Sequence, residues 1–170
     1  IVSAPEPTVS PTTIEVGEIE VGEPTLRTVV VSNDGGEPFT INTDEIGSDD
    51  PGVNARLVGS PKVVPGGESV VAVRINRSNG GPVSTSVSIP TEGPAADLSV
   101  GVNGNAVAAE LQTNTLDSVS FNPTAEGSAS SETLVINNTG EATLTVGRPT
   151  ITGSDRAAFS VLSGDQELRI

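Results

Sequence analysis

Five residue types are missing from this chain of 170 residues, which contains no cysteine, histidine, methionine, tryptophan or tyrosine. Without cysteine it has no disulfide framework and no thiolate metal site, so cysteine usage does not reveal its redox compartment. Without histidine or cysteine, and with Lys62 as its single lysine, it cannot assemble the usual nucleophile and base pairs of hydrolases. The sequence therefore predicts a protein that is not an enzyme and that uses no cofactor.

Aromatic side chains are scarce as well, because Phe39, Phe121 and Phe159 are the only ones. Glycosidases and lectins hold sugars against aromatic rings, and proteins that bind single-stranded nucleic acid stack bases on them. This scarcity argues against all three activities. The phenylalanines fall on the inward phase of predicted strands, which favours a place in a core for each of them.

Basic residues are few: the chain has 8 of them against 22 acidic residues, and its formal net charge is −14. Nucleic acids and anionic membrane surfaces are bound by clusters of lysine and arginine, so we expect no nucleic-acid partner. A carboxylate-rich surface with one lysine is typical of salt-loving microbes, where high ionic strength screens the self-repulsion. The other interpretation is an ordinary acidic secreted protein.

Long apolar runs are also absent, since none approaches the roughly twenty residues that span a bilayer. We therefore expect no direct membrane insertion by this segment. Because the chain begins with Ile1 rather than methionine, we expect it to be cut from a longer polypeptide whose anchor lies elsewhere. Other protein subunits are the partners that this composition leaves open.

An internal repeat is the main feature that the chain does have. Asn33–Ile41 reappears as Asn138–Val146, shifted by 105 positions (33 to 138). A repeat near one hundred residues corresponds to a whole domain. A constant shift aligns Ile170 with Pro65, so the second copy has no counterpart of the strand-forming segments 69–75, 83–89 and 98–102.

Short apolar stretches separated by turn residues predict strands throughout the first copy. They cover 14–16, 19–21, 26–32, 39–41, 54–58, 71–75, 83–89 and 98–102. The apolar phase slips between Val16 and Ile19, and Gly17 permits the bulge that restores it. The run from Asn33 to Gly36 predicts a turn, because asparagine, aspartate and glycine tolerate positive φ.

These strands predict an all-β protein of tandem immunoglobulin-like antiparallel β-sandwiches, the second of which is incomplete. We expect a proline-rich N-terminal linker at 1–13 and a complete sandwich at 14–108. A second linker at 109–115 and a partial sandwich at 116–170 follow. The Cys…Trp…Cys signature of antibody domains is absent, so the predicted likeness concerns architecture only.

Two stretches carry a resemblance to a known family. They are Ile14-Glu15-Val16-Gly17 with Asn33-x-Gly35 and Phe39-Thr40-Ile41, and Asn138-Thr139-Gly140 with Ile151-Thr152-Gly153-Ser154-Asp155. This pattern resembles the Ig-like repeat of microbial surface proteins of the choice-of-anchor kind, and it is similar to the abnormal-spindle/hydin (ASH) module. The resemblance implies a spacer or interaction role at the surface of a microbe, which the charge suggests is a haloarchaeon.

Acidic residues and glycosylation sequons supply the candidate sites. Asp44, Asp49 and Asp50 lie in one acidic loop and offer oxygen ligands for Ca²⁺, but their spacing fits no regular calcium motif. A solvated loop is the expected outcome, with no metal site. Asn76 and Asn137 head Asn-x-Ser/Thr sequons and are candidate glycosylation sites.

The incomplete second copy admits two explanations. One sheet cannot cover its own inner face, and an open sandwich exposes strand edges. In the first explanation the chain is a fragment of a longer surface protein whose next residues complete the module. In the second, a neighbouring subunit contributes the missing strands and so links subunits into a filament.

The function predicted from these observations is non-enzymatic and extracellular: a structural or adhesion module of a cell-surface stalk or filament. One alternative is a fibre or decoration protein of a virion that infects a halophilic host. A second alternative is a module that binds a protein or glycan through its loops at 44–52 and 79–81.

Overall fold

The computed structural model describes residues 3–115 and 118–170. It divides the chain into two compact units, Ile1–Val107 and Ala108–Ile170. The predicted linker at 1–13 and the predicted partial sandwich at 116–170 each begin with two residues that lie outside the described part. No helix in the described residues is long and apolar enough to cross a membrane.

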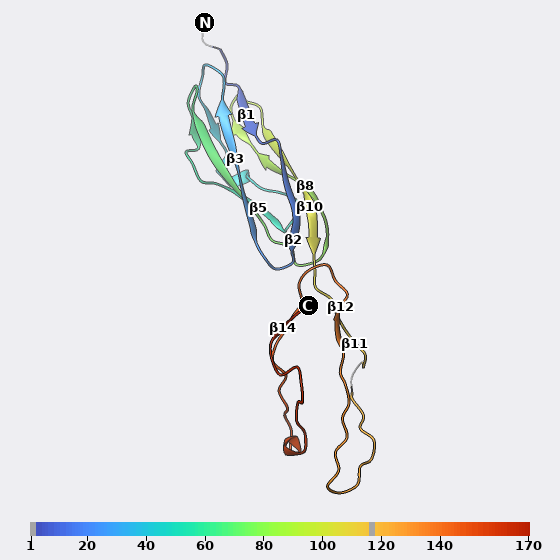
Figure 1. The fold of residues 1–170 in the computed structure, drawn as a ribbon. Helices are drawn as coiled ribbons and strands as arrows, with labels where there is room; N and C mark the ends of the chain where they lie inside the picture. The colour runs from blue at the N-terminus through green and yellow to red at the C-terminus, as the bar shows by residue number, and fades with distance from the viewer. Residues whose placement is uncertain (1–2, 116–117) are drawn as a thin grey trace. The chain divides into compact units, whose positions relative to one another are not determined.

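One four-stranded antiparallel sheet forms half of the first unit (Figure 1). Its strands are, in spatial order, β1 (Pro7–Ser10), β3 (Thr25–Asn33), β7 (Glu68–Ile75) and β5 (Val53–Leu57). Strand β7 lies inside this sheet and pairs with β3 along one edge and β5 along the other. Alternating valines and isoleucine give β7 the pattern of a strand with a buried inner face.

A second sheet and a smaller one complete the unit. The second sheet has the order β2 (Thr13–Glu20), β10 (Leu98–Val107) and β8 (Gly81–Ile89). Its β2–β10 pair is parallel and its β10–β8 pair is antiparallel. The small sheet is antiparallel and has the order β6 (Lys62–Val63), β4 (Phe39–Ile41) and β9 (Thr91–Glu92), with a 3₁₀ turn, η1 (Thr43–Glu45), after β4.

Side chains from all three sheets form one aliphatic core between the layers. Val29, Val71, Val73 and Val100 have no exposed surface, and Phe39 is 3% exposed. Residues 3–107 are therefore an immunoglobulin-like β-sandwich, and the all-β prediction is confirmed for this unit.

Gly17 forms the bulge that the slipped apolar phase predicts. Its φ is +69°, a left-handed value that glycine adopts without steric cost. The pairing of β2 with β10 steps from Glu15 directly to Gly17, so Val16 is the additional residue. As a result Ile14, Val16 and Ile19 all point into the core.

The stretch predicted as the N-terminal linker contains a strand that the sequence analysis did not find. Residues 7–10 form β1, which pairs in antiparallel register with β3 from Pro7–Asn33 to Ser10–Val30. Its end residues Pro7 and Ser10 are poor strand signals, and its middle residues Thr8 and Val9 are too few to indicate a strand by themselves. Pairing with the buried strand β3 completes it. The chain then crosses between the layers and continues as β2.

The second unit reproduces two pieces of the first in the same register. Strand β11 (Leu111–Thr113) pairs with β12 (Ile136–Asn138), setting Leu111 opposite Asn138 as β1 sets Pro7 opposite Asn33. Strand β13 (Thr145–Val146) pairs with β14 (Leu168–Arg169), as β4 pairs with β6. Strand β11 occupies the predicted linker at 109–115, because that segment is the counterpart of β1.

The pairing also corrects the alignment of the two copies. Thr145 lies opposite Arg169 as Thr40 lies opposite Lys62, so the shift grows to 107 positions near the end (62 to 169). Ile170 therefore corresponds to Val63 and not to Pro65. A constant shift missed this, because the second copy has two more residues between its counterparts of β4 and β6.

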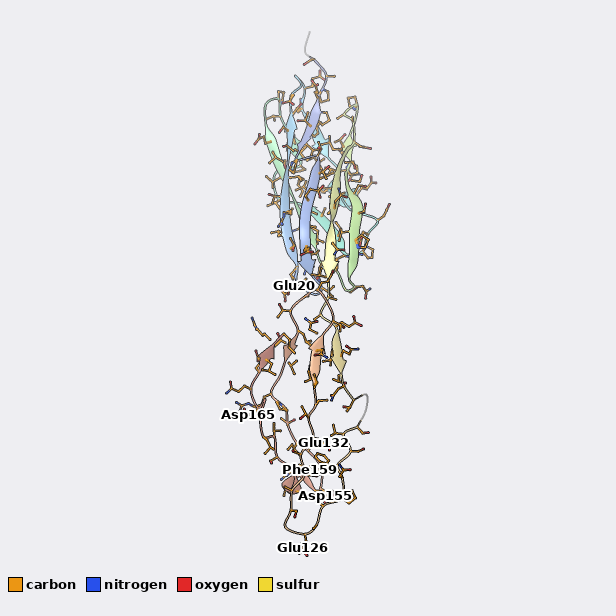
Figure 2. The ribbon with its side chains drawn as sticks, turned by 45° about the vertical axis from the view of Figure 1, so that its right-hand side comes forward. Glu20, Glu126, Glu132, Asp155, Phe159 and Asp165 are labelled. Carbon is orange, nitrogen blue, oxygen red and sulfur yellow. The ribbon has the colours of Figure 1, made fainter. Side chains whose placement is uncertain are left out.

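The remainder of the second unit is irregular. Residues 118–135, all of which the structure describes, form no strand, and the other regular element is a 3₁₀ turn, η2 (Arg156–Ala158). Ala142 is the one buried hydrophobic residue among the described residues of this unit. The second copy thus has two short strand pairs joined by long open segments (Figure 2).

Because their burial differs, substitution by alanine should affect stability very differently at two aliphatic residues of the four-stranded sheet, Ile75 on β7 and Leu26 on β3. Ile75 has no exposed surface. The substitution Ile75→Ala should therefore lower the free energy of unfolding of the first unit by about 2–5 kcal/mol. The matched variant Leu26→Ala, at a position 62% exposed, should change it by less than about 0.5 kcal/mol. Native-state hydrogen exchange of β7 amides measures both, since the chain lacks tryptophan and tyrosine for fluorescence. Equal losses would contradict the assignment of β7 as the core strand.

Candidate functional site

Asn33 joins three separate segments of the first unit and has no exposed surface. Its Oδ1 accepts hydrogen bonds from the backbone N–H groups of Glu6 (3.2 Å) and Gly35 (3.0 Å). Its Nδ2 donates to the carbonyl oxygens of Glu37 (2.8 Å) and Val63 (3.2 Å). We call Asn33 with these four partners the asparagine clamp, because it holds the incoming chain, the turn after β3 and β6 together.

The clamp requires glycine at position 35, because the backbone of the incoming segment passes too close for a side chain. A Cβ at this position would lie 2.5 Å from the nitrogen of Glu6 and would collide with the carbonyl oxygen of Ala4. The turn exists as predicted, but the predicted reason is wrong, because no residue from Asn33 to Gly36 has positive φ. Among the described residues no residue other than glycine has positive φ, so Asn33 acts through its side-chain amide and not through its backbone.

Asn138 makes a second clamp with the same set of bonds. Its Oδ1 accepts from the N–H groups of Glu110 (3.1 Å) and Gly140 (3.0 Å). Its Nδ2 donates to the carbonyl oxygens of Ala142 (2.7 Å) and Ile170 (3.0 Å). The incoming segment is again tied by backbone bonds, from Thr139 N–H to Glu110 and from Glu141 N–H to Ala108.

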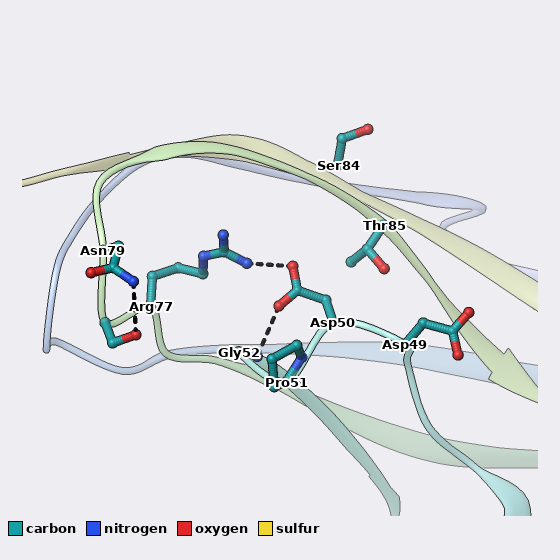
Figure 3. A pocket seen from close by; sticks show the side chains of 9 residues that line it. Asp49, Asp50, Pro51, Gly52, Arg77, Asn79, Ser84 and Thr85 are labelled. Carbon is teal, nitrogen blue, oxygen red and sulfur yellow. Dashed lines mark hydrogen bonds and ion pairs between the residues drawn. The ribbon is translucent and has the colours of Figure 1, made fainter.

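An ion pair between Arg77 and Asp50 lies in a surface hollow of about 460 Å³ (Figure 3). Asp50 also accepts a hydrogen bond from the N–H of Gly52 (2.8 Å) through its other carboxylate oxygen. The hollow is lined by residues 49–52, 77–79 and 84–85. It brings together the two loops that the sequence analysis proposed for binding, and its polar lining contains no aromatic surface.

The three acidic candidates for a metal do not form one cluster. Asp44 lies in η1, and its backbone N–H is capped by the side chain of Asn42. Asp49 lines the hollow, and Asp50 is paired with Arg77. No group of three acidic side chains placed to hold a metal occurs among the described residues. Pairing with an arginine also offsets the negative charge that a cation at Asp50 would require.

The two glycosylation candidates differ in exposure. Asn137 is exposed on β12, whereas Asn76 is half-buried at the end of β7. The Oδ1 of Asn76 is buried without a hydrogen-bond donor, and its backbone N–H donates to the carbonyl oxygen of Gly52. An attached glycan needs the amide of its asparagine in solvent, so Asn137 is the better placed of the two.

The second unit carries an exposed apolar surface that we call the open face. It comprises Val119, Phe121, Leu134, Ile151, Phe159 and Val161, whose exposed fractions lie between 38% and 51%. Three of them repeat core positions of the first unit: Val119 repeats Ile14, Phe121 repeats Val16 and Leu134 repeats Val29. Those counterparts are 4%, 6% and 0% exposed.

Two of the three phenylalanines are therefore not core residues, contrary to the sequence prediction. Phe39 is buried, but Phe121 is 45% exposed and Phe159 is 50% exposed. The two rings lie against each other, with centroids 5.7 Å apart and planes tilted by 53°. They occupy the alternating positions that the sequence assigns to the inner side, but no strand in the described part of the second unit covers them.

Comparisons with known proteins identify no family for this chain. No protein-family model matches it, and no curated protein matches it. Solved structures do match. A protein of unknown function from Porphyromonas gingivalis W83 aligns with a TM-score of 0.50 and 17% identity. The match covers 59% of this chain and 46% of that one, so it spans less than half of the Porphyromonas protein.

Two further matches are to an ASH domain and to surface-layer domains. The ASH / PapD-like domain 7 of human CEP192 aligns with a TM-score of 0.46 and 12% identity, over 61% of this chain and 87% of that one. Domains 4 and 5 of the S-layer protein SbsC align with a TM-score of 0.39 and 20% identity, over 60% and 53%. At these identities the likeness concerns the fold alone.

The asparagine clamp predicts that substituting Asn33 destabilises the first unit, although the sequence pattern assigns this residue only to a turn. Asn33→Ala removes four hydrogen bonds in a buried place and should cost about 2–4 kcal/mol, measured by hydrogen exchange of β7 amides. The control Asn42→Ala removes one exposed bond and should cost less than about 1 kcal/mol. Asn138→Ala should speed exchange at Glu110 and Gly140 and leave β7 unchanged. A small cost for Asn33→Ala would refute the clamp.

Proposed function

We propose that this chain is a non-enzymatic structural segment of a cell-surface protein, built from immunoglobulin-like modules in tandem. The observation that carries the proposal is the duplicated asparagine clamp, in which Asn33 and Asn138 make equivalent bonds. Each clamp holds the segment through which the chain enters a module. A device repeated at each module start is what a tandem array requires.

The junction between the modules supports the same proposal. Strand β10 ends at Val107, and Ala108 already accepts hydrogen bonds from Glu141 and Ala142 in the second clamp. No unpaired linker residues separate the last strand of one unit from the clamped segment of the next. We therefore propose module boundaries at 107/108 in place of the predicted linker at 109–115, with 108–170 as the partial second sandwich.

The surface chemistry fits a structural role at high ionic strength. The chain has a net charge of −14, and no histidine, cysteine or lysine lines its hollow at Arg77 to activate the hydroxyl groups there. A carboxylate-rich surface keeps a protein dispersed in concentrated salt. We accordingly propose an extracellular location in a salt-loving microbe, with other protein subunits as partners and Asn137 as the glycosylated position.

Surface labelling tests the proposed function directly. Antibodies raised against residues 3–107 should label intact cells of the source organism, and external protease should release the antigen without lysis. The matched control is an antibody against a cytosolic protein of the same cells, which should label permeabilised cells only. Antigen confined to the cytosolic fraction would exclude the surface role, whatever the fold.

Net charge predicts that salt stabilises the first unit. The thermal midpoint, followed by far-UV circular dichroism, should rise between about 0.1 M and 1 M NaCl, because the screening length falls from about 10 Å to about 3 Å. A variant with Glu18→Gln, Glu20→Gln and Glu23→Gln, three exposed residues around the end of β2, should show a shallower rise. A midpoint that is unchanged or falls with salt would contradict the halophile proposal.

A further inference from the structure

We propose that two copies of this chain bind each other through the outer faces of the two main sheets of the first unit. The arginine face is the outer side of the sheet β1–β3–β7–β5 and carries Arg56 and Arg74. The glutamate face is the outer side of the sheet β2–β10–β8 and carries Glu15 and Glu18. This inference rests on the proposed function, because it names a second copy as the protein subunit that the structural segment contacts.

The arginine face has an apolar centre. The core residues of β7 alternate with Val70, Ala72 and Arg74, which therefore lie on its outer side. Strand pairing sets Val30 of β3 beside Val70 and Arg56 of β5 beside Ala72. Ala72 is only 7% exposed although it is not part of the core cluster, because the side chains around it already cover it from outside.

Two large aliphatic side chains extend this centre. Leu26 lies opposite Arg74 and is 62% exposed. Val58 follows β5, donates its backbone N–H to the carbonyl oxygen of Val70 (2.8 Å) and is 60% exposed. Glu68 is the one acidic residue among the outward positions of these four strands. Aliphatic surface with arginine and few carboxylates is the composition of a protein interface.

The two arginines of this face have no carboxylate partner within the chain. Among residues 3–115 and 118–170 the one ion pair joins Arg77 to Asp50. The chain has 22 acidic residues and 8 basic ones, so pairing within the chain would have been easy to arrange. Arg56 and Arg74 are therefore available to carboxylates of another molecule, which a guanidinium group binds with two parallel hydrogen bonds.

The glutamate face supplies carboxylates of this kind. Glu15 lies opposite Asn103 and Glu18 lies opposite Asn105, and no lysine or arginine occurs in β2, β8 or β10. The bulge keeps both glutamates outward, since a step of three residues would otherwise turn the second one toward the core. The Nδ2 of Asn103 donates to the Oε1 of Glu15 (3.1 Å), which fixes this carboxylate in place.

The spacing of the charges agrees between the two faces. Arg56 lies opposite Ala72, two residues from Arg74, so the two arginines are diagonal neighbours about 7–8 Å apart. Glu15 and Glu18 face positions 103 and 105, which are two residues apart on β10, or about 7 Å. Each arginine of one copy can therefore meet one glutamate of the other.

Only unlike faces fit each other. Two arginine faces would bring like charges together, and so would two glutamate faces. Contact of an arginine face with a glutamate face is heterologous, so each copy binds one neighbour on either side and the contact repeats. The chain connections leave both faces uncovered, because Glu6 bonds to Asn33 at one end of the unit and Val107 pairs with Glu20 at the other (Figure 1).

The area of the contact predicts that a single pair is weak. The arginine face has four strands, and β7 has 8 residues, which gives about 500 Å². A stable pair of proteins buries about 800 Å² on each partner. The contact therefore gains strength when several modules of neighbouring chains engage at once.

Exchange of charges between the two faces tests the proposal in the full chain. One variant carries Arg56→Glu with Arg74→Glu, and the other carries Glu15→Arg with Glu18→Arg. Each should raise the dissociation constant of self-association at least about ten-fold, because like charges then meet. An equimolar mixture of the two should restore association, since the faces of one variant again oppose those of the other in charge. Sedimentation equilibrium over a range of chain concentrations measures all three.

Two controls separate the contact from net charge and from misfolding. The variant Lys62→Glu with Arg148→Glu has the net charge of the arginine variant, and its two exposed positions lie on neither face, so it should associate as the unmodified chain does. The variant Arg56→Gln with Arg74→Gln removes the charges without reversing them and should weaken association less. Far-UV circular dichroism confirms the fold of each, and the glutamine variant replaces the other if that one unfolds.

Cross-linking locates the contact. With Arg74→Lys, a carbodiimide should join the new amine to Glu15 or Glu18 of another copy, and a mixture of isotope-labelled and unlabelled chains identifies links between copies. Lys62 is the internal reference, because it lies on neither face. Links from Lys62 to these two glutamates should be less abundant by about ten-fold, since this lysine does not meet them in the proposed contact.

Each other outcome overturns the proposal. Association that is equal in all variants would belong to the open face of the second unit, and association still lost in the mixture would mean that the two faces do not meet. A chain that stays monomeric at every concentration would exclude a second copy. If that chain binds a polyglutamate peptide through Arg56 and Arg74, the arginine face serves a different acidic protein. Surface labelling is independent of these results, so failure of the proposed function is recognised separately.

Discussion

Pairing of β7 on both of its edges is the constraint on which the first unit depends. Through β7 the backbone of β3 is joined to that of β5, and Val71 and Val73 of β7 have no exposed surface in the core. The second copy shows what remains without such a strand. Its apolar positions keep their inward phase, but the segments that carry them form no extended sheet. In the first unit, strand pairing along the edges of β7 and burial of its side chains therefore occur together and support each other.

The asparagine clamp supplies a different kind of order, which does not depend on β7. In each copy one asparagine amide, buried at Asn33 and half-buried at Asn138, makes four hydrogen bonds that fix the chain where it enters the unit. A buried polar side chain stabilises a structure only when its bonding capacity is met, and here both amide atoms are paired twice. The second unit is therefore ordered at its clamped end and open along its apolar surface.

The proposed structural function uses this division between fixed ends and an open surface. Under that proposal the repeated modules act through position and contact, and the aliphatic core of the first unit supplies a rigid frame. The hollow at Arg77 is a polar surface feature in which the arginine is held by Asp50.

The sequence by itself determined the all-β architecture, the repeat, most strands of the first copy and the bulge at Gly17, because these follow from local alternation and from single glycines. It did not determine β1, the role of Asn33 or the exposure of Phe121. A strand of weak propensity forms only beside a buried neighbour, and an amide acts as a clamp only when segments 27 and 30 residues away meet it. Inward phase is a property of a strand, whereas burial requires a second layer, and only the tertiary structure decides whether that layer is present.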